Sequence, residues 1–191
     1  MFLPTTQAQY TQRSSLKITY SLIAANVAVF VALQLGGDKA FVTLAQTGDL
    51  FFAGAYWQIF TAMFVHFDIL HIAFNMYALF YFGRLNEVAY TKGQYLAVYF
   101  GAGLLGNAVS LFLIPGDVLT AGASGAIFGL IGSYVARERT GVNMAMAVLY
   151  AALIFIISSG PGVNVFAHLF GVLGGFALGW LFTPRRGDDR L

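Results

Sequence analysis

The stretch Ala121-Gly-Ala-Ser-Gly-Ala-Ile-Phe-Gly-Leu-Ile-Gly-Ser133 combines a hydrophobic run with a glycine at every third or fourth position. Each such glycine costs about 1 kcal/mol in a water-soluble helix, but in a membrane helix it lets a neighbouring backbone approach closely. Small residues recur every four positions, at Ala121, Gly125, Gly129 and Ser133, and predict one smooth helical face. Ser124 lies beside that face. It is either a packing residue bonded to its own backbone or a functional hydroxyl, and the stretch alone leaves both open.

The composition predicts an integral membrane protein. Of 191 residues, 59% are hydrophobic and 9% are charged, and the mean hydropathy is +0.75. Ordinary soluble domains are about 25% charged. The net charge of +2 gives no indication of a nucleic-acid partner. The absence of cysteine excludes disulfides, a thiolate nucleophile and a cysteine-ligated metal.

Six apolar runs predict an all-α bundle of six membrane-spanning helices. They cover residues 18–35, 69–85, 95–114, 121–136, 142–157 and 165–182. The first is too long for a typical signal-peptide core and has no small-x-small cleavage site, so we expect an uncleaved helix. Residues 36–59 are mixed and rich in aromatic residues, which is typical of a loop at the membrane surface. A membrane domain at 18–183 would lie between polar tails at 1–17 and 184–191.

The basic residues predict the orientation. With six spans, nine of the ten Lys and Arg residues fall on one side and only Lys39 falls on the other. The positive-inside rule therefore places both termini in the cytoplasm. Spans two, four and six then all begin at the outer side. Ser124 and His168 each lie about 5 Å below the expected starts of spans four and six, so they share one depth.

This shared depth makes His168 a candidate partner of Ser124. A histidine within a membrane span is costly, which favours a functional residue over a core residue whose polar atoms are merely satisfied. Span six carries a second stripe of small residues, at Ala167, Gly171, Gly175 and Gly179. If the two stripes pack together, the Ser124 hydroxyl and the His168 ring come within hydrogen-bonding reach, which is what activation of a serine requires.

His71 and Asn75, at i and i+4, share one face of span two. They are either donors that stabilise an oxyanion, together with backbone N–H groups at the start of span four, or polar contacts between helices. His66 precedes the helix and lies off that face, so we interpret it as structural or supporting.

These residues resemble the signatures of the rhomboid family of intramembrane serine proteases. Gly122-Ala-Ser124-Gly125 resembles its GxSG motif, and the run from Ala167 through His168 to Gly175 resembles AHxxGxxxG. His66, His71 and Asn75 match its His-x4-His-x3-Asn pattern. The resemblance covers all six spans in order, over about residues 18–182.

The resemblance implies a six-helix rhomboid bundle in which Ser124 is the nucleophile and His168 the general base. His71, Asn75 and the backbone amide of Ser124 would form the oxyanion hole. The implied supporting residues are His66, Gly122, Gly125, Phe128 and Gly171. The expected substrates are transmembrane segments of membrane proteins, cut near the outer face without a metal or cofactor. The expected location is a bacterial inner membrane in contact with lipid, and the natural substrate and oligomeric state stay open.

The resemblance also assigns the loops, with two departures. Residues 36–57 would form the family's partly submerged hairpin, and span five with the loop 158–163 a mobile cap and gate. Gln58 stands where the family often has arginine, which leaves the anchoring of the hairpin open. Phe128 stands where a tyrosine commonly packs on the histidine ring; phenylalanine can still stack but has no hydroxyl.

Other classes of protein explain the sequence less well. No acidic residue lies in a span near His168, and the nearest candidates, Asp68 and Asp117, are at loop edges, which favours a dyad over a triad. A transporter or channel would also use histidines and glycine-rich helices, but the chain shows no inverted repeat and no acidic residue at mid-membrane. A metalloprotease would need an H-E-x-x-H helix or a carboxylate ligand. An inactive relative would be expected to lose Ser124 or His168.

Overall fold

The computed structural model describes residues 16–138 and 163–183, together with Ala145, Val148, Leu149 and Ala152. The long helices within these ranges are α2 (Lys17–Leu44), α5 (Ile69–Ala89), α6 (Lys92–Leu113), α7 (Ser124–Arg137) and α9 (Val165–Phe182). Between α2 and α5 lie the short helices α3 (Gly48–Phe52) and α4 (Gln58–Thr61) and the 3-10 helix η1 (Ala62–Phe64). Most of the predicted fifth span, residues 142–157, and the loop 158–162 lie outside the described residues.

The described residues form an all-helical bundle with several helices suited to a membrane. Helices α2, α6 and α9 are each long and apolar enough to cross a bilayer. A fourth span results if the segment Gln58–Phe64 and α5, which meet at 90°, are counted together. The predicted all-α membrane fold is therefore confirmed in this coarser form, and the number of six spans remains a prediction.

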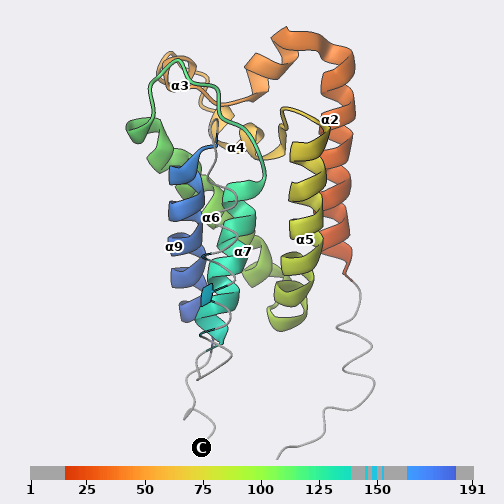
Figure 1. Ribbon diagram of the computed structural model, residues 1–191, viewed down its shortest axis with the longest axis vertical. Coiled ribbons are helices and arrows are strands. Elements are labelled where there is room, and N and C mark those ends of the chain that lie inside the picture. The colour runs from red at the N-terminus through yellow and green to blue at the C-terminus, as the bar shows by residue number, and fades with distance from the viewer. Residues whose placement is uncertain (1–15, 139–144, 146–147, 150–151, 153–162, 184–191) are drawn as a thin grey trace, which may run out of the picture.

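The long helices run in two opposite directions. Figure 1 shows α2 and α6 running one way and α5, α7 and α9 running the other way. The start of α2 and the end of α9 lie at the same end of the bundle. We call the opposite end, where α5, α7 and α9 begin, the site end; it is uppermost in Figure 1. Placing the other end in the cytoplasm remains a prediction.

The first helix is longer than predicted. It continues past residue 35 to Leu44, with a break at Gly37, whose φ of 68° and ψ of −174° lie outside the helical region. Glycine adopts this positive φ at little cost, so the helix can bend there and resume. The bend directs residues 38–44 sideways toward α3 at the site end (Figure 1). Part of the predicted loop at 36–59 is therefore helical.

The serine helix starts later than predicted, at Ser124 rather than at residue 121. Gly122 has a φ of 133°, which ends any helical path through it. Backbone bonds hold the preceding segment extended: Thr120 pairs with Gln46, and Gly122 N donates to Ala62 O at 2.9 Å. Ala121 therefore leaves the predicted stripe and packs near Leu33, Ala45 and Val65.

The rest of the two predicted stripes pack against each other, as expected. A Cβ added to Gly171 would collide with the backbone of Gly125, and one added to Gly175 with the backbone of Gly129. A Cβ on Gly179 would lie 2.7 Å from the Cα of Ser133. Helices α7 and α9 therefore meet backbone to backbone along most of their lengths.

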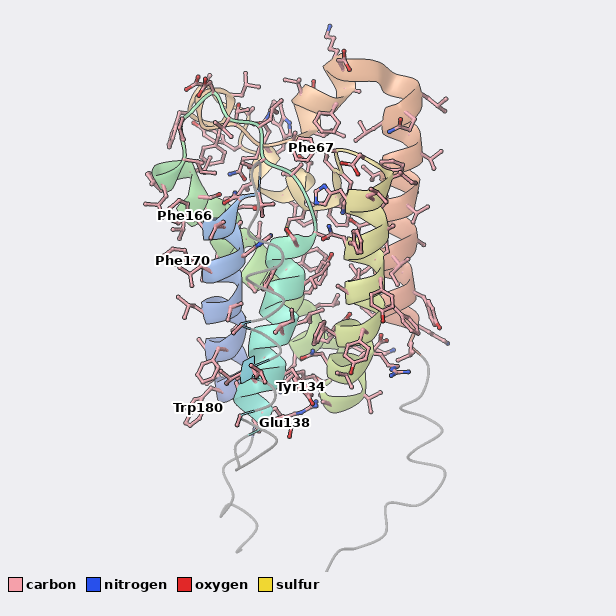
Figure 2. The ribbon with its side chains drawn as sticks, viewed as in Figure 1. Phe67, Tyr134, Glu138, Phe166, Phe170 and Trp180 are labelled. Atoms are coloured by element: carbon pink, nitrogen blue, oxygen red, sulfur yellow. The ribbon has the colours of Figure 1, made fainter. Side chains whose placement is uncertain are left out.

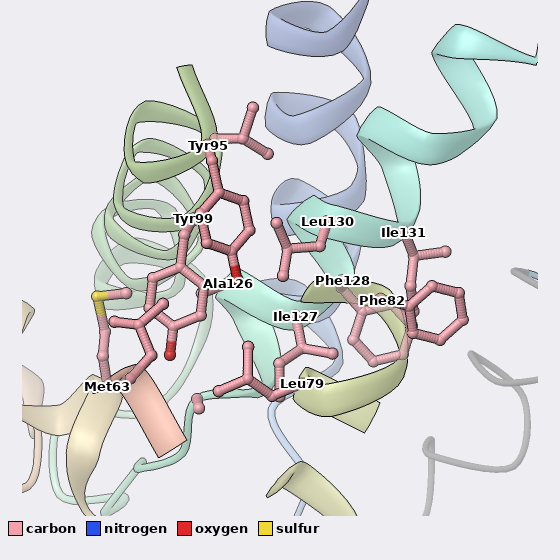
Figure 3. Close-up of a cluster of buried hydrophobic side chains, with 13 residues drawn as sticks. Met63, Leu79, Phe82, Tyr95, Tyr99, Ala126, Ile127, Phe128, Leu130 and Ile131 are labelled. Atoms are coloured by element: carbon pink, nitrogen blue, oxygen red, sulfur yellow. The ribbon is translucent and has the colours of Figure 1, made fainter. Parts of the chain in front are cut away.

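Helix α7 lies at the centre of the bundle. Its Ile127, Phe128, Leu130 and Ile131 are buried against Leu79 and Phe82 of α5 and Tyr95 and Tyr99 of α6 (Figure 3). With 14 residues it is only about 21 Å long, shorter than the roughly 30 Å hydrocarbon core. On α9, Phe166 and Trp180 are exposed and point away from the bundle (Figure 2), as expected of a face that contacts lipid.

Candidate active site

The hydroxyl of Ser124 and the ring of His168 are in direct contact. The Oγ atom of Ser124 lies 2.8 Å from Nε2 of His168. Ser124 is the first residue of α7, and His168 lies in the first turns of α9. The glycine contacts between α7 and α9 bring the two backbones close enough for these side chains to meet. The structure thus brings into contact the two residues that the sequence places at the same depth.

Two neighbours position His168. Phe128, one turn along α7 from Ser124, stacks on it with ring centroids 4.3 Å apart and an interplanar angle of 25°. The phenylalanine therefore stacks as expected. Asn164 caps α9, with its Oδ1 accepting from Ala167 N at 2.9 Å. This bond fixes the turn that carries His168, which is 4% exposed.

The extended segment before Ser124 is bordered by His71. A Cβ placed on Gly122 would lie 3.0 Å from His71 Nε2 and 3.5 Å from Ser124 Oγ. Both atoms therefore border the space that this glycine leaves open. With a φ of 133°, any other residue at 122 would be strained and would also crowd His71.

The hydrogen bonds of His71 leave Nε2 as a donor. Its Nδ1 accepts from Phe67 N at 3.4 Å, so a neutral ring carries its proton on Nε2, the atom beside Gly122. Asp68 caps α5 by accepting from His71 N at 2.8 Å. The Phe67 ring stacks on the His71 ring, with centroids 5.8 Å apart. These contacts fix the ring in one orientation.

The start of α7 differs from the starts of α5 and α9. Asp68 and Asn164 cap α5 and α9, whereas Ala123, the residue before α7, supplies no side-chain cap. The first N–H groups of a helix have no partner within the helix and carry its positive dipole end. Because no side chain among the described residues bonds to them in α7, they can serve as donors to a developing negative charge beside Ser124.

Asn75 and His66 support His71 from two sides. Asn75 lies one turn along α5, is 7% exposed, and donates through Nδ2 to His71 O at 2.9 Å. A second N–H of that amide remains for another acceptor. His66 is buried at 1% exposure, and its ring packs edge-on against the His71 ring at 5.0 Å. The structure thus places both Asn75 and His66 in contact with His71.

Gln58 anchors residues 45–64, the segment between α2 and α5 that we call the hairpin from here on. The sequence left this anchoring open. It is 1% exposed, its Oε1 accepts from Thr47 N at 3.2 Å, and its Nε2 donates to Val42 O at 3.1 Å. Trp57 adds a bond from Nε1 to Thr43 O at 2.9 Å. The glutamine therefore ties the hairpin to the end of α2.

Sequence reasoning missed several residues that position the site. Asn164 and Asp68 each stand directly before an apolar helix, where a side-chain cap is expected, so the capping rule could have found them. The pairing of Gln46 with Thr120 joins residues far apart in the chain, and no local pattern indicates it. Within the described residues, no three His, Asp or Glu side chains are grouped to hold a metal ion.

Known proteins are similar to this chain in sequence. The family model described as the rhomboid domain matches residues 53–185. Rhomboid protease GluP of Bacillus subtilis is 33% identical over 95% of this chain, and the match covers 38% of the length of GluP. The B. subtilis protein YdcA is 34% identical over 70% of this chain and 70% of its own length. Rhomboid-like protease 2 of Toxoplasma gondii is 30% identical over 72% of this chain and 52% of its own length. The chain belongs to the rhomboid family.

Proposed function

We propose that the chain is an intramembrane serine endopeptidase that cleaves transmembrane segments of membrane proteins with Ser124 and His168. The observation that carries the proposal is the 2.8 Å separation between Ser124 Oγ and His168 Nε2. A serine hydroxyl is a weak nucleophile until a base within hydrogen-bonding reach takes its proton. Family membership and the protease names of relatives such as GluP support the same reaction class.

The proposed reaction uses this geometry. Ser124 Oγ attacks the carbonyl carbon of the scissile peptide bond while His168 Nε2 takes the hydroxyl proton. The same nitrogen then gives the proton to the leaving amine, and an acyl group remains on Ser124. Water, deprotonated by His168, hydrolyses this ester and releases the second product. His71 Nε2, the amide of Asn75 and the free N–H groups at the start of α7 would hold the oxyanion.

The residues near Ser124 and His168 favour a catalytic dyad over a triad. The helices that carry Ser124, His168 and His71 contain no Asp or Glu near these residues; Glu87 is at the far end of α5. Asp68, one of the two acidic candidates in the sequence, accepts a bond from His71 N as the cap of α5. Asp117, the other, is exposed in the segment that precedes α7. His168 would therefore act as base without a carboxylate from these positions.

The position of Ser124 indicates the class of substrate. Because α7 is short and starts below the tops of α5 and α9 (Figure 1), the serine lies recessed from the site end. A peptide bond within a helix is tied up in backbone hydrogen bonds, so a substrate helix must unwind to reach it. We therefore expect cleavage of segments with small or helix-breaking residues near the outer face, by a multi-pass protein with both termini in the cytoplasm, in a bacterial inner membrane.

Covalent labelling tests this proposal. The purified full chain in detergent should react with a fluorophosphonate at Ser124 and cleave a reporter transmembrane segment. Ser124→Ala and His168→Ala should lose both activities while remaining folded. Ser133→Ala is a matched control on the same helix: its Oγ bonds Asn86 Oδ1 at 3.0 Å, so the change should lower stability but leave labelling intact. Cleavage by Ser124→Ala protein would refute the assignment of the nucleophile.

A further inference from the structure

The bend at Gly37 leaves a groove at the site end of the molecule. Four residues beyond the bend and six residues of the hairpin line an open groove of about 740 Å³: Asp38, Lys39, Val42, Thr43, Leu50, Ala53, Gly54, Ala55, Trp57 and Gln58. We call it the arm groove. Its volume is in the range of sites for small molecules, roughly 300–1,000 Å³. It is separate from Ser124 and His168, neither of which lines it.

The surface of the arm groove is largely apolar. Val42 and Leu50 are each 38% exposed, and Trp57 is 53% exposed. The indole N–H of Trp57 donates to Thr43 O at 2.9 Å, so this ring is tied to the opposite side of the groove. An exposed apolar lining of this kind accommodates hydrocarbon rather than a purely polar ligand.

Two opposite charges complete the lining. Asp38 and Lys39 are adjacent, and both are exposed. The only ion pair among the described residues joins Arg137 to Glu138, at the other end of the bundle. Asp38 and Lys39 therefore both remain available to an external ligand that carries one anionic and one cationic group.

The groove lies at the level where lipid headgroups are expected. Exposed aromatic residues gather on the same hairpin, at Phe52, Tyr56 and Trp57. Such rings prefer the boundary between headgroups and hydrocarbon. Lys39 is also the one cation at this end among the described residues. The other described cations all lie toward the end of the bundle that is opposite the site end: Lys17, Arg84, Lys92 and Arg137.

We propose that the arm groove binds a phospholipid with a zwitterionic headgroup. Its phosphate would contact the ammonium of Lys39, and its own ammonium would contact the carboxylate of Asp38. The upper part of an acyl chain would lie on Val42, Leu50 and Trp57. A phospholipid with an anionic headgroup and no ammonium would leave Asp38 unpaired beside a like charge.

The bound lipid would stabilise the segment that carries the nucleophile. The hairpin holds that segment through three backbone bonds. Asp49 N donates to Gly116 O and Gln46 N to Thr120 O, both at 2.9 Å, and Thr120 N donates to Gln46 O at 2.8 Å. A ligand that joins the end of α2 to the hairpin therefore also restrains residues 116–120. By linkage, it should raise the melting temperature of the whole chain.

Native mass spectrometry of the purified full chain tests the proposal, with phosphatidylethanolamine and phosphatidylglycerol of identical acyl chains. The wild type should bind phosphatidylethanolamine more tightly, by roughly fivefold or more. Lys39→Gln should weaken this binding by a similar factor, and Asp38→Asn should remove the preference between the two lipids. Lys92→Gln, which removes an exposed cation at the other end of the bundle, is the matched control and should change neither affinity.

A groove-filling variant provides an independent check. Ala53→Phe places a ring in the arm groove and should weaken the binding of both lipids. Equal binding of the two lipids by the wild type would overturn the proposal, and so would equal effects of Lys39→Gln and Lys92→Gln. These readouts measure binding only, so their failure would not bear on the proposed protease activity. Loss of labelling at Ser124 would likewise leave the lipid site untouched.

Discussion

Gly171 of α9 lies directly against the backbone of Gly125 of α7, with no room between them for a Cβ atom. Gly125 directly follows Ser124, and Gly171 lies about one turn after His168, so this contact sets the separation of the two side chains. Gly171→Ala should therefore push the helices apart and weaken the Ser124–His168 bond. Overpacking of this kind costs about 1–3 kcal/mol. We expect a lower melting temperature and a loss of fluorophosphonate labelling.

Gly93→Ala is the control for Gly171→Ala. It lies in α6, and a Cβ there would meet nothing within 4 Å. Alanine is the better helix former by about 1 kcal/mol, so this variant should be neutral or slightly more stable. If Gly171→Ala kept full labelling and stability, the close approach of α7 and α9 would not be what positions the pair.

The four-residue spacing of small residues predicted the α7–α9 contact because residues at that spacing form one smooth helix face, which local sequence shows directly. Gly125, Gly129, Gly171, Gly175 and Gly179 all lie where that pattern puts them. The same rule failed at Ala121, since Gly122 has a positive φ and the segment before Ser124 is extended. Glycine occurs both in packing stripes and at helix breaks, and the sequence pattern does not tell these two roles apart.

The supporting contacts could not be predicted because they depend on the tertiary fold. Gln46 meets Thr120 only after α2 bends and the hairpin folds over the end of α6. The bonds of Gln58 join residues 11 to 16 positions apart, and their geometry follows from the bend at Gly37. The helix caps at Asp68 and Asn164 were within reach of sequence rules, since both are local.

Gln58→Met should loosen the hairpin while preserving side-chain volume. The change removes an acceptor for Thr47 N and a donor for Val42 O. The first of these hydrogen bonds is buried and the second is partly buried. A backbone group left unpaired in such a place costs about 1–3 kcal/mol. We expect a clear fall in the melting temperature, measured by thermal unfolding in detergent. Gln34→Met, at an exposed position of α2, should show no such fall and serves as the control.

Asn164→Ala should displace the turn that carries His168. It removes the bond to Ala167 N, and loss of an N-cap typically costs about 1 kcal/mol. Asn164→Asp keeps an oxygen acceptor and should restore most of the turnover that Asn164→Ala loses. Rescue by aspartate would show that the capping bond matters, rather than the packing of the side chain. Equal turnover of the alanine and aspartate variants would mean that the side-chain cap has no part in positioning His168.

Asn75→Ala should lower turnover strongly with little change in apparent substrate affinity, because an oxyanion donor acts only as negative charge develops. Loss of one such donor costs about 3 kcal/mol, or roughly a hundredfold in rate. His71→Ala should act in the same direction but less, since the uncapped N–H groups of α7 remain as donors. Steady-state kinetics on the purified variants measures both quantities.

The competing interpretation makes Asn75 and His71 polar contacts that only hold the fold. Asn75 does donate to His71 O at 2.9 Å, so some loss of stability is expected from Asn75→Ala in either case. The two interpretations differ in turnover per folded molecule, which should fall only if these side chains hold the oxyanion. Melting temperature and active-site titration on the same preparations separate them. A large drop in melting temperature with turnover per labelled Ser124 unchanged would remove both residues from the oxyanion hole and leave the N–H groups at the start of α7 as its donors.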